Sequence, residues 1–145
     1  KRHGVPTAPE SRAFPLPITE RDAAWLAAVV DCEGWIGTCG TKGRFFNRIG
    51  VGNTNPKLIA RLLELTGLGS VRHVICKNPR AKPQVHWQVS KKDEVRTLLL
   101  TILPHLILKE EQATLILALP PLHTKQHAQR VATHLQLKAL NKKGV

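Results

Sequence analysis

The chain has 145 residues, 42% of them hydrophobic, and 22 Lys and Arg against 10 Asp and Glu give it a formal net charge of +12. This length is typical of one domain with a substantial core, and the charge favours a polyanionic partner, first of all nucleic acid, over a merely soluble basic protein. No stretch reaches the about 18 consecutive apolar residues of a membrane span, no signal-peptide pattern is present, and three cysteines without a C-x-x-C pair suggest free thiols in a reducing compartment.

The N-terminal residues 1–17 contain Pro6, Pro9, Pro15 and Pro17, which predicts an extended basic arm before a single domain at 18–145. Thr19 begins a capping box, and the helix after it extends to about Asp31. Its expected apolar stripe is Trp25, Leu26, Val29 and Val30. Small residues recur four apart at Ala24 and Ala28 and at Ala23 and Ala27. This spacing indicates either close approach of a second helix or simply high helix propensity.

Four strands and four further helices follow. We expect strands at 35–40, 44–53, 69–76 and 84–90, with a helix opened by Asn55-Pro56 and ended by Gly67 between the two pairs. A leucine-rich helix then extends to Leu103 and is interrupted by Pro104. Later helices are expected at about 108–119 and 124–140. With the helix interrupted at Pro104 counted once, the order is α-β-β-α-β-β-α-α, which predicts an α+β fold with a four-stranded antiparallel sheet, its helices gathered on one face.

The outer face of the predicted sheet has no acidic residue. Alternation places Val, Ile and Trp inward and sends polar side chains outward: Arg44, Arg48, Arg72, Gln84, His86 and Gln88. An antiparallel sheet can simply leave such a face in water. Arg, Asn and Gln are, however, the side chains that read base edges in the major groove, which favours a nucleic-acid platform.

Two carboxylates, Asp31 and Glu33, end the first helix, where the helix dipole is negative. Water could solvate both carboxylates. Beside the phosphates of a nucleic acid, a divalent ion that bridges carboxylate and phosphate would also remove the repulsion between these negative groups. Mg²⁺ binds in this way to one or two carboxylates and phosphate oxygens.

The segment Leu26-Ala27-Ala28-Val29-Val30-Asp31-Cys32-Glu33-Gly34 resembles the signature of the LAGLIDADG homing endonucleases. It departs from that signature at Ala28, where glycine is usual, and at Cys32, where Ala or Gly is usual. The resemblance covers roughly residues 19–119 and includes the downstream order of elements. It implies the family's αββαββα core with a saddle-shaped sheet on double-stranded DNA, and it leaves the arm and an extra C-terminal helix outside.

The single copy of the signature implies the homodimeric type of the family. Its members cut long near-palindromic sites in both strands, and the small residues would then lie at or near the dimer interface: Ala24, Ala27 and Ala28. The implied cofactor is Mg²⁺ or another divalent cation. The implied location is an intracellular compartment that contains DNA, such as a prokaryotic cytoplasm or an organelle.

The same resemblance nominates site residues. Glu33 corresponds to the metal-binding catalytic acid, the backbone carbonyl of Cys32 to a further metal ligand, and Asp31 to a structural residue. Lys109 and Asn53 are expected to order and polarise the attacking water. Six side chains are expected to read bases, namely Arg44, Arg48, Arg72, Gln84, His86 and Gln88. The side chains expected to contact phosphates are Lys42, Lys77, Arg80, Lys82 and the tail Lys142-Lys143.

Two alternatives remain at this level. Relatives with this fold act without cutting DNA, as intron RNA maturases or transcription regulators, and intron RNA is then a further partner. The presence of both Glu33 and Lys109 favours a nuclease. The other alternative is a basic interaction module in which the match to the signature is accidental.

Overall fold

The computed structural model describes residues 14–41, 44–75, 77–118 and 127–142. Its first half comprises α1 (Glu20–Glu33), β1 (Gly34–Thr41), β2 (Arg44–Asn53) and α2 (Pro56–Thr66). Then follow β3 (Ser70–Val74), β4 (Gln84–Val89), α3 (Lys92–Ile102), the short η2 (Leu103–His105), α4 (Glu110–Leu117) and α5 (His127–Lys142). The predicted α+β class and order of elements are confirmed, and η2 occupies the interruption at Pro104.

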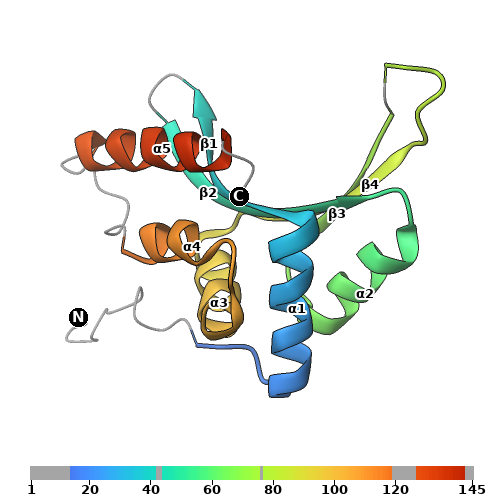
Figure 1. Ribbon diagram of the computed structural model, residues 1–145, viewed down its shortest axis with the longest axis horizontal. Coiled ribbons are helices and arrows are strands. Elements are labelled where there is room, and N and C mark those ends of the chain that lie inside the picture. Colours follow the sequence, from blue (N-terminus) through green and yellow to red (C-terminus); the bar gives the residue numbers. More distant parts are fainter. Residues whose placement is uncertain (1–13, 42–43, 76, 119–126, 143–145) are drawn as a thin grey trace, which may run out of the picture.

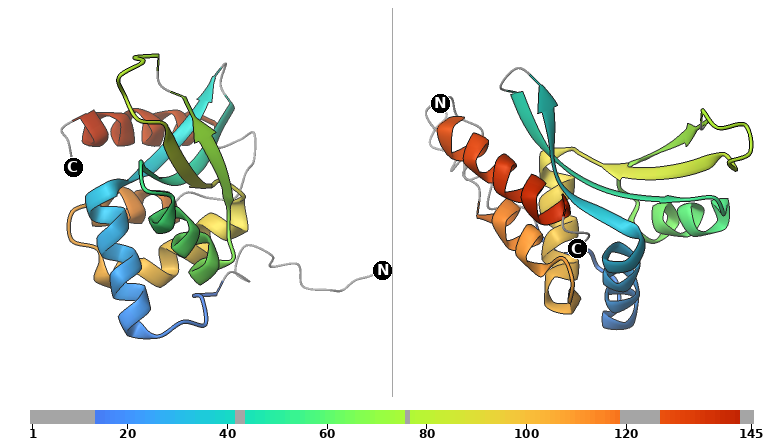
Figure 2. Two further views of the ribbon diagram at one scale, coloured as in Figure 1. Left: turned by 90° about the vertical axis from the view of Figure 1, so that its right-hand side faces the viewer. Right: turned by 45° about the horizontal axis from the view of Figure 1, so that its top comes forward.

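The four strands form one antiparallel sheet in the order β1-β2-β4-β3. β1 pairs with β2 along its whole length, whereas β4 pairs with β2 only from Ile49 to Asn53. The helices α1 to α4 gather on one side of the sheet, and its other side curves into a saddle without helices (Figure 1, Figure 2). We call this second side the concave face.

The hydrophobic core lies between the sheet and the helices. Alternate strand residues such as Ile36, Ile49 and Trp87 are fully buried and pack with Leu26 of α1 and Leu99 of α3. The Trp87 Nε1 donates to the carbonyl of Leu68 at 2.8 Å, so the polar atom of the largest core side chain is satisfied. This core holds the lower side of the sheet and leaves the concave face available.

The helix α1 passes into β1 without a loop. Thr19 Oγ1 accepts from the Asp22 backbone N–H at 3.1 Å and caps the helix, as predicted, and α1 extends two residues beyond the expected end at Asp31. A Cβ on Gly34 would lie 2.8 Å from the carbonyl oxygen of Val30 and 3.0 Å from that of Gly50. Only glycine therefore allows the end of α1 to lie this close to β2.

The last helix, α5, packs on the β1–β2 hairpin. His134 contacts two residues of this hairpin, through a hydrogen bond between its Nδ1 and the Thr38 hydroxyl and through ring stacking with Phe45 at a centroid separation of 4.4 Å. Leu137 is buried beneath α5, and Asn141 Nδ2 donates to the carbonyl of Ile36 at 3.0 Å. The helix outside the family resemblance is thus part of the same packed unit.

Of the predicted N-terminal arm, residues 1–13 lie outside the described part of the chain. Residues 14–17 form no helix or strand, and the Leu16 N–H donates to Thr101 Oγ1 at 2.8 Å, which ties this segment to α3. None of the described helices has the length and apolar character needed to cross a membrane.

The contact at Gly34 leads to a stability prediction. We expect Gly34→Ala to lower the free energy of unfolding by roughly 1–3 kcal/mol, because the added methyl group overlaps two backbone oxygens. Gly50→Ala on the facing strand is the control, since the nearest atom to its added Cβ lies at 3.5 Å, an ordinary contact. Urea unfolding of both variants measures the difference, and equal free energies would contradict the steric account.

Candidate functional site

Asp31, near the end of α1, has a structural role. Its Oδ2 accepts from the backbone N–H of Ile107 at 2.7 Å, and its Oδ1 accepts from those of Leu108 at 3.2 Å and Lys109 at 3.0 Å. The residue is buried, and backbone donors to an ionised carboxylate form strong hydrogen bonds. Asp31 therefore fixes the segment between η2 and α4 against the foot of α1.

Lys109 lies at the foot of α1 because of these bonds. It is only 6% exposed, and its Nζ donates to the backbone carbonyl of Asp31 at 2.6 Å. A cation is favourable at a helix C-terminus, where the carbonyl groups carry partial negative charge. The helix predicted from Leu108 begins only at Glu110, so Lys109 is the N-cap of α4 and precedes its first turn.

Glu33, the last residue of α1, differs from Asp31 in its surroundings. It is exposed, and among the described residues its carboxylate has no hydrogen-bond or ion-pair partner. The carbonyl of Cys32 lies in the last helical turn, where carbonyls have no partner within the helix. A free carboxylate and a free carbonyl are oxygen ligands of the kind that Mg²⁺ takes.

The donor set at Glu33 fits a divalent cation only in part. In the described part of the chain, no three His, Cys, Asp or Glu side chains converge. The oxygens of Asp31 are engaged by backbone donors and do not add to the set. An ion held by Glu33 and the Cys32 carbonyl would therefore complete its coordination with water, phosphate oxygens or another chain.

Asn53 is the last residue of β2, and the strand pairing places it near the C-terminal end of α1. Its neighbour Val51 pairs with Gly34, the residue after Glu33. Asn53 Oδ1 accepts from the Asn55 N–H at 2.8 Å, which leaves the amide nitrogen as the group able to meet a water. The structure thus brings Lys109 to within two residues of Glu33 along α1 and places Asn53 on the adjacent strand.

The concave face presents the residues predicted to read bases. Strand pairing places His86 opposite both Gly52 and Arg72, and Gln88 opposite both Gly50 and Ser70, so these side chains share one face. His86 Nε2 and Gln84 Oε1 form a hydrogen bond of 2.9 Å along β4. None of the four strands contains an acidic residue.

Arg48 also belongs to the concave face, and the sequence prediction did not include its neighbour there, Phe46, among the base-reading residues. The Arg48 Cζ lies 5.1 Å from the ring centroid of Phe46, two residues earlier on the same face. Burial raises the pKa of the Cys39 thiol, opposite Phe46, whereas the positive charge of Arg48 acts in the other direction. The alternation of two along β2 already grouped Phe46 with Arg48 and was the signal that could have identified it.

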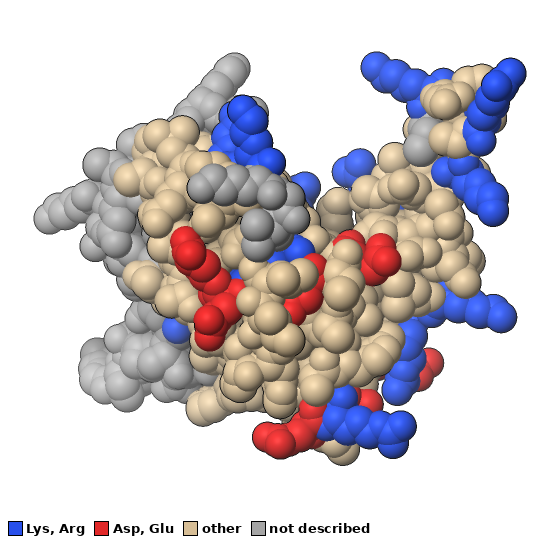
Figure 3. All heavy atoms as spheres, in the orientation of Figure 1, with Lys and Arg blue, Asp and Glu red and all other residues tan. Residues whose placement is uncertain are grey.

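Basic residues gather at the β3–β4 end of the saddle. Exposed side chains in the β3–β4 connection are Lys77, Arg80 and Lys82. Figure 3 shows Lys and Arg gathered at the far end of this hairpin, whereas Asp and Glu lie across the middle of the molecule and at its lower edge. The predicted Lys42, Lys143 and the side chain of Arg44 lie outside the described residues, and Lys142 is exposed at the end of α5.

The outer side of α1 limits which of the small residues could meet a second helix. Ala27, predicted at or near the interface, is fully buried in the core of its own chain, so its side chain cannot itself contact a partner. Ala24 and Ala28 are exposed and remain available. Trp25, which was expected in the buried stripe, is 37% exposed, because the core covers the opposite side of α1.

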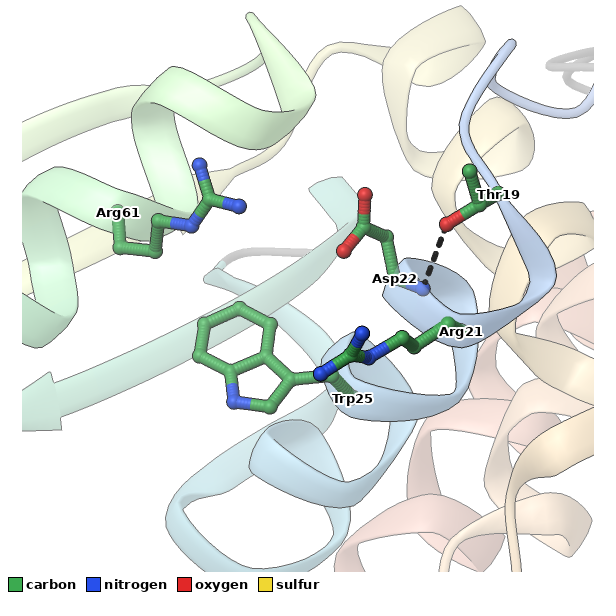
Figure 4. Close-up of a pocket in the computed structure, with 5 residues that line it drawn as sticks. All are labelled: Thr19, Arg21, Asp22, Trp25 and Arg61. Carbon is green, nitrogen blue, oxygen red and sulfur yellow. Dashed lines mark hydrogen bonds between the residues drawn. The ribbon is translucent and has the colours of Figure 1, made fainter.

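A pocket of about 600 Å³ flanks this exposed side of α1. Its lining residues come from the start of α1 and from α2, and they are Thr19, Arg21, Asp22, Trp25 and Arg61. In Figure 4 the Trp25 ring lies between the two arginines, and the Asp22 carboxylate points toward Arg61. The pocket is at the end of α1 remote from Glu33, so it does not belong to the candidate site at the helix foot.

No protein-family model matches the chain, and no curated protein matches it. Solved structures do. The homing endonuclease I-CvuI, in complex with the I-CreI target and in the presence of Mg, is 23% identical over 83% of this chain and 82% of that chain, with a TM-score of 0.67. I-CvuI in complex with its own target in the presence of Ca is 21% identical, with the same coverage and a TM-score of 0.68.

An archaeal intron-encoded homing endonuclease complexed with DNA, I-Vdi141I, is 14% identical over 83% of this chain and 84% of that chain, with a TM-score of 0.65. The LAGLIDADG meganuclease I-AabMI, bound to uncleaved DNA, matches 65% of this chain over 34% of its own length, with a TM-score of 0.55. The chain has the fold of the LAGLIDADG homing endonucleases. These neighbours confirm the fold that the resemblance of residues 26–34 implied.

Substitutions of the two acids at the end of α1 should change the free energy of unfolding by different amounts. We expect Asp31→Ala to lower the free energy of unfolding by about 2–4 kcal/mol. The substitution removes the acceptor of three backbone hydrogen bonds and therefore releases the segment that carries Lys109. Glu33→Ala should change it by less than about 0.5 kcal/mol, since Glu33 is exposed. Urea denaturation compares the two, and a large loss for Glu33→Ala would show that Glu33 is a structural residue.

Proposed function

We propose that the protein is a site-specific DNA endonuclease that hydrolyses one phosphodiester bond in each strand of a long, near-palindromic duplex site as a homodimer. The observation that supports this most directly is the difference between the two acids. The Asp31 carboxylate accepts three backbone hydrogen bonds, whereas Glu33 has no partner among the described residues. The buried Lys109 donates to the backbone carbonyl of Asp31, two residues before Glu33. This pair lies where α1 meets a sheet whose other face is basic and free of helices. The structural neighbours, which are DNA-bound homing endonucleases, support the same function.

Glu33 and the Cys32 carbonyl are the groups that would hold a divalent cation, Mg²⁺ by the chemistry of its oxygen ligands. When bound there, such an ion supplies activation of water and stabilisation of the leaving 3′ oxygen. The rest of the reaction depends on residues of the chain. The Lys109 ammonium, held at the end of α1, polarises a water beside the scissile phosphate, and the Asn53 amide orients water from the other side.

The homodimer follows from a single acid per chain. Cutting two strands symmetrically requires two copies of Glu33, and a two-fold arrangement brings the same helix from each subunit together. Ala24 and Ala28 are small and exposed on the outer side of α1, so two such helices can approach closely there. The concave faces then form one continuous surface along the DNA.

The concave face recognises the site. Side chains of β2, β3 and β4 contact base edges in the major groove, while exposed Lys77 and Arg80 and the rest of the β3–β4 connection contact phosphates. The phosphate contacts make the affinity fall steeply with salt.

The test of catalysis is Glu33→Gln. The wild-type chain, incubated with a library of duplexes and Mg²⁺, should cut a defined site, and the variant should cut it at least about 10²-fold more slowly while binding it with similar affinity. Glu20→Gln is the matched control, because it makes the same exchange at an exposed position at the opposite end of the same helix. A wild-type chain that cuts no duplex and binds RNA tightly would replace this proposal with the RNA maturase alternative.

Assembly has its own test. We expect the chain to sediment as a dimer and Ala28→Arg to sediment as a monomer, because a long cation cannot be accommodated between two close helices. Ala60→Arg, an equivalent exchange on the exposed side of α2, should leave the dimer intact. Analytical ultracentrifugation with and without DNA decides, and a wild-type monomer in both conditions would contradict the paired-helix arrangement.

A further inference from the structure

Phe46 is an aromatic side chain that does not contribute to the hydrophobic core. It is 40% exposed on the concave face. Its neighbour Phe45 points to the other side of β2 and stacks on His134 of α5. One phenylalanine of this pair therefore serves packing within the chain. A single exposed apolar residue is ordinary, so the contacts of Phe46 decide whether it has a role.

The main contact of Phe46 is with Arg48. The guanidinium carbon lies 5.1 Å from the ring centroid, within the about 6 Å over which a cation–π contact is favourable. The Nε of Arg48 is buried, and no acceptor in the described part of the chain meets it. With Nε covered, the donors of Arg48 that can reach a partner outside the chain are those of its two Nη groups.

No charged side chain faces this pair across the β1–β2 ladder. Cys39 stands opposite Phe46, and Gly37, over which the Trp35 ring lies, stands opposite Arg48. Both residues precede Ile49, where the pairing of β2 with β4 begins. They therefore lie on the two-stranded part of the saddle, which is narrow enough to enter a major groove.

We propose that Phe46 is a further specificity-determining residue, which acts with Arg48 as one unit to read a thymine and a guanine within two adjacent base-pair steps. The inference rests on the proposed DNA recognition. The Nη donors match the N7 and O6 acceptors of guanine, and the ring offers an apolar contact for the thymine 5-methyl group. Residues i and i+2 of a strand are about 6.6 Å apart, which corresponds to two base-pair rises of about 3.4 Å.

A phosphate contact by Arg48 is the competing explanation, and it predicts a different result. A phosphate carries no sequence information, so loss of Phe46 would then weaken binding to all duplexes equally. If the pair reads bases, loss of Phe46 abolishes a preference at one position and leaves the others intact.

The experiment is a binding selection from a randomised duplex library without divalent cation, followed by affinity measurements on the enriched site. Replacing the thymine read by Phe46 with deoxyuridine removes only the 5-methyl group and should weaken wild-type binding about fourfold. Phe46→Ala should be insensitive to that replacement. Replacing the guanine with 7-deazaguanine removes the N7 acceptor and should weaken wild-type binding about tenfold. The affinity of Arg48→Gln should not change on this replacement.

The control variant is Leu135→Ala, which truncates another exposed apolar side chain, one on α5 and outside the concave face. It should respond to deoxyuridine as the wild type does. Equal losses for wild type and Phe46→Ala at every thymine would overturn the inference while leaving DNA recognition intact. A library from which no duplex is enriched would overturn the proposed function and the inference together.

Discussion

The hydrogen bonds between the Asp31 carboxylate and the backbone of residues 107–109 are the constraint on which the rest of the site depends. They join the end of the first helix to a segment 76 to 78 residues later in the chain. The same junction receives the Lys109 ammonium on the Asp31 carbonyl. One acid is thus used to build this junction, whereas Glu33, two residues later, has no partner among the described residues.

The two faces of the sheet differ in composition, one packing on the helices and the other being the face that we propose binds DNA. The face toward the helices holds fully buried residues such as Ile49 and Trp87. The other face combines arginine, glutamine, histidine and glycine without any acid. The period of two along each strand is enough to produce both faces from one short sequence, so a substitution on the concave face has little effect on the core.

Most of the fold could be predicted from the sequence, because capping residues, prolines and strand alternation are local signals. Thr19, Asn55 and Gly67 end or begin helices where expected. The errors concern contacts between distant segments. Ala27 and Ala28 are identical in propensity, and only the packing of the first helix on the core decides that Ala27 is buried. The position of Lys109 before its helix likewise depends on Asp31, 78 residues away.

The docking of α5 has a consequence for the outermost strand of the sheet. β1 has a neighbour on one side only, and the unpaired carbonyl groups of such a strand can template pairing with another chain. Asn141 donates to the Ile36 carbonyl on this strand, and α5 covers the hairpin beside it. The helix α5 thereby covers the β1 border of the sheet and protects it from edge-to-edge aggregation.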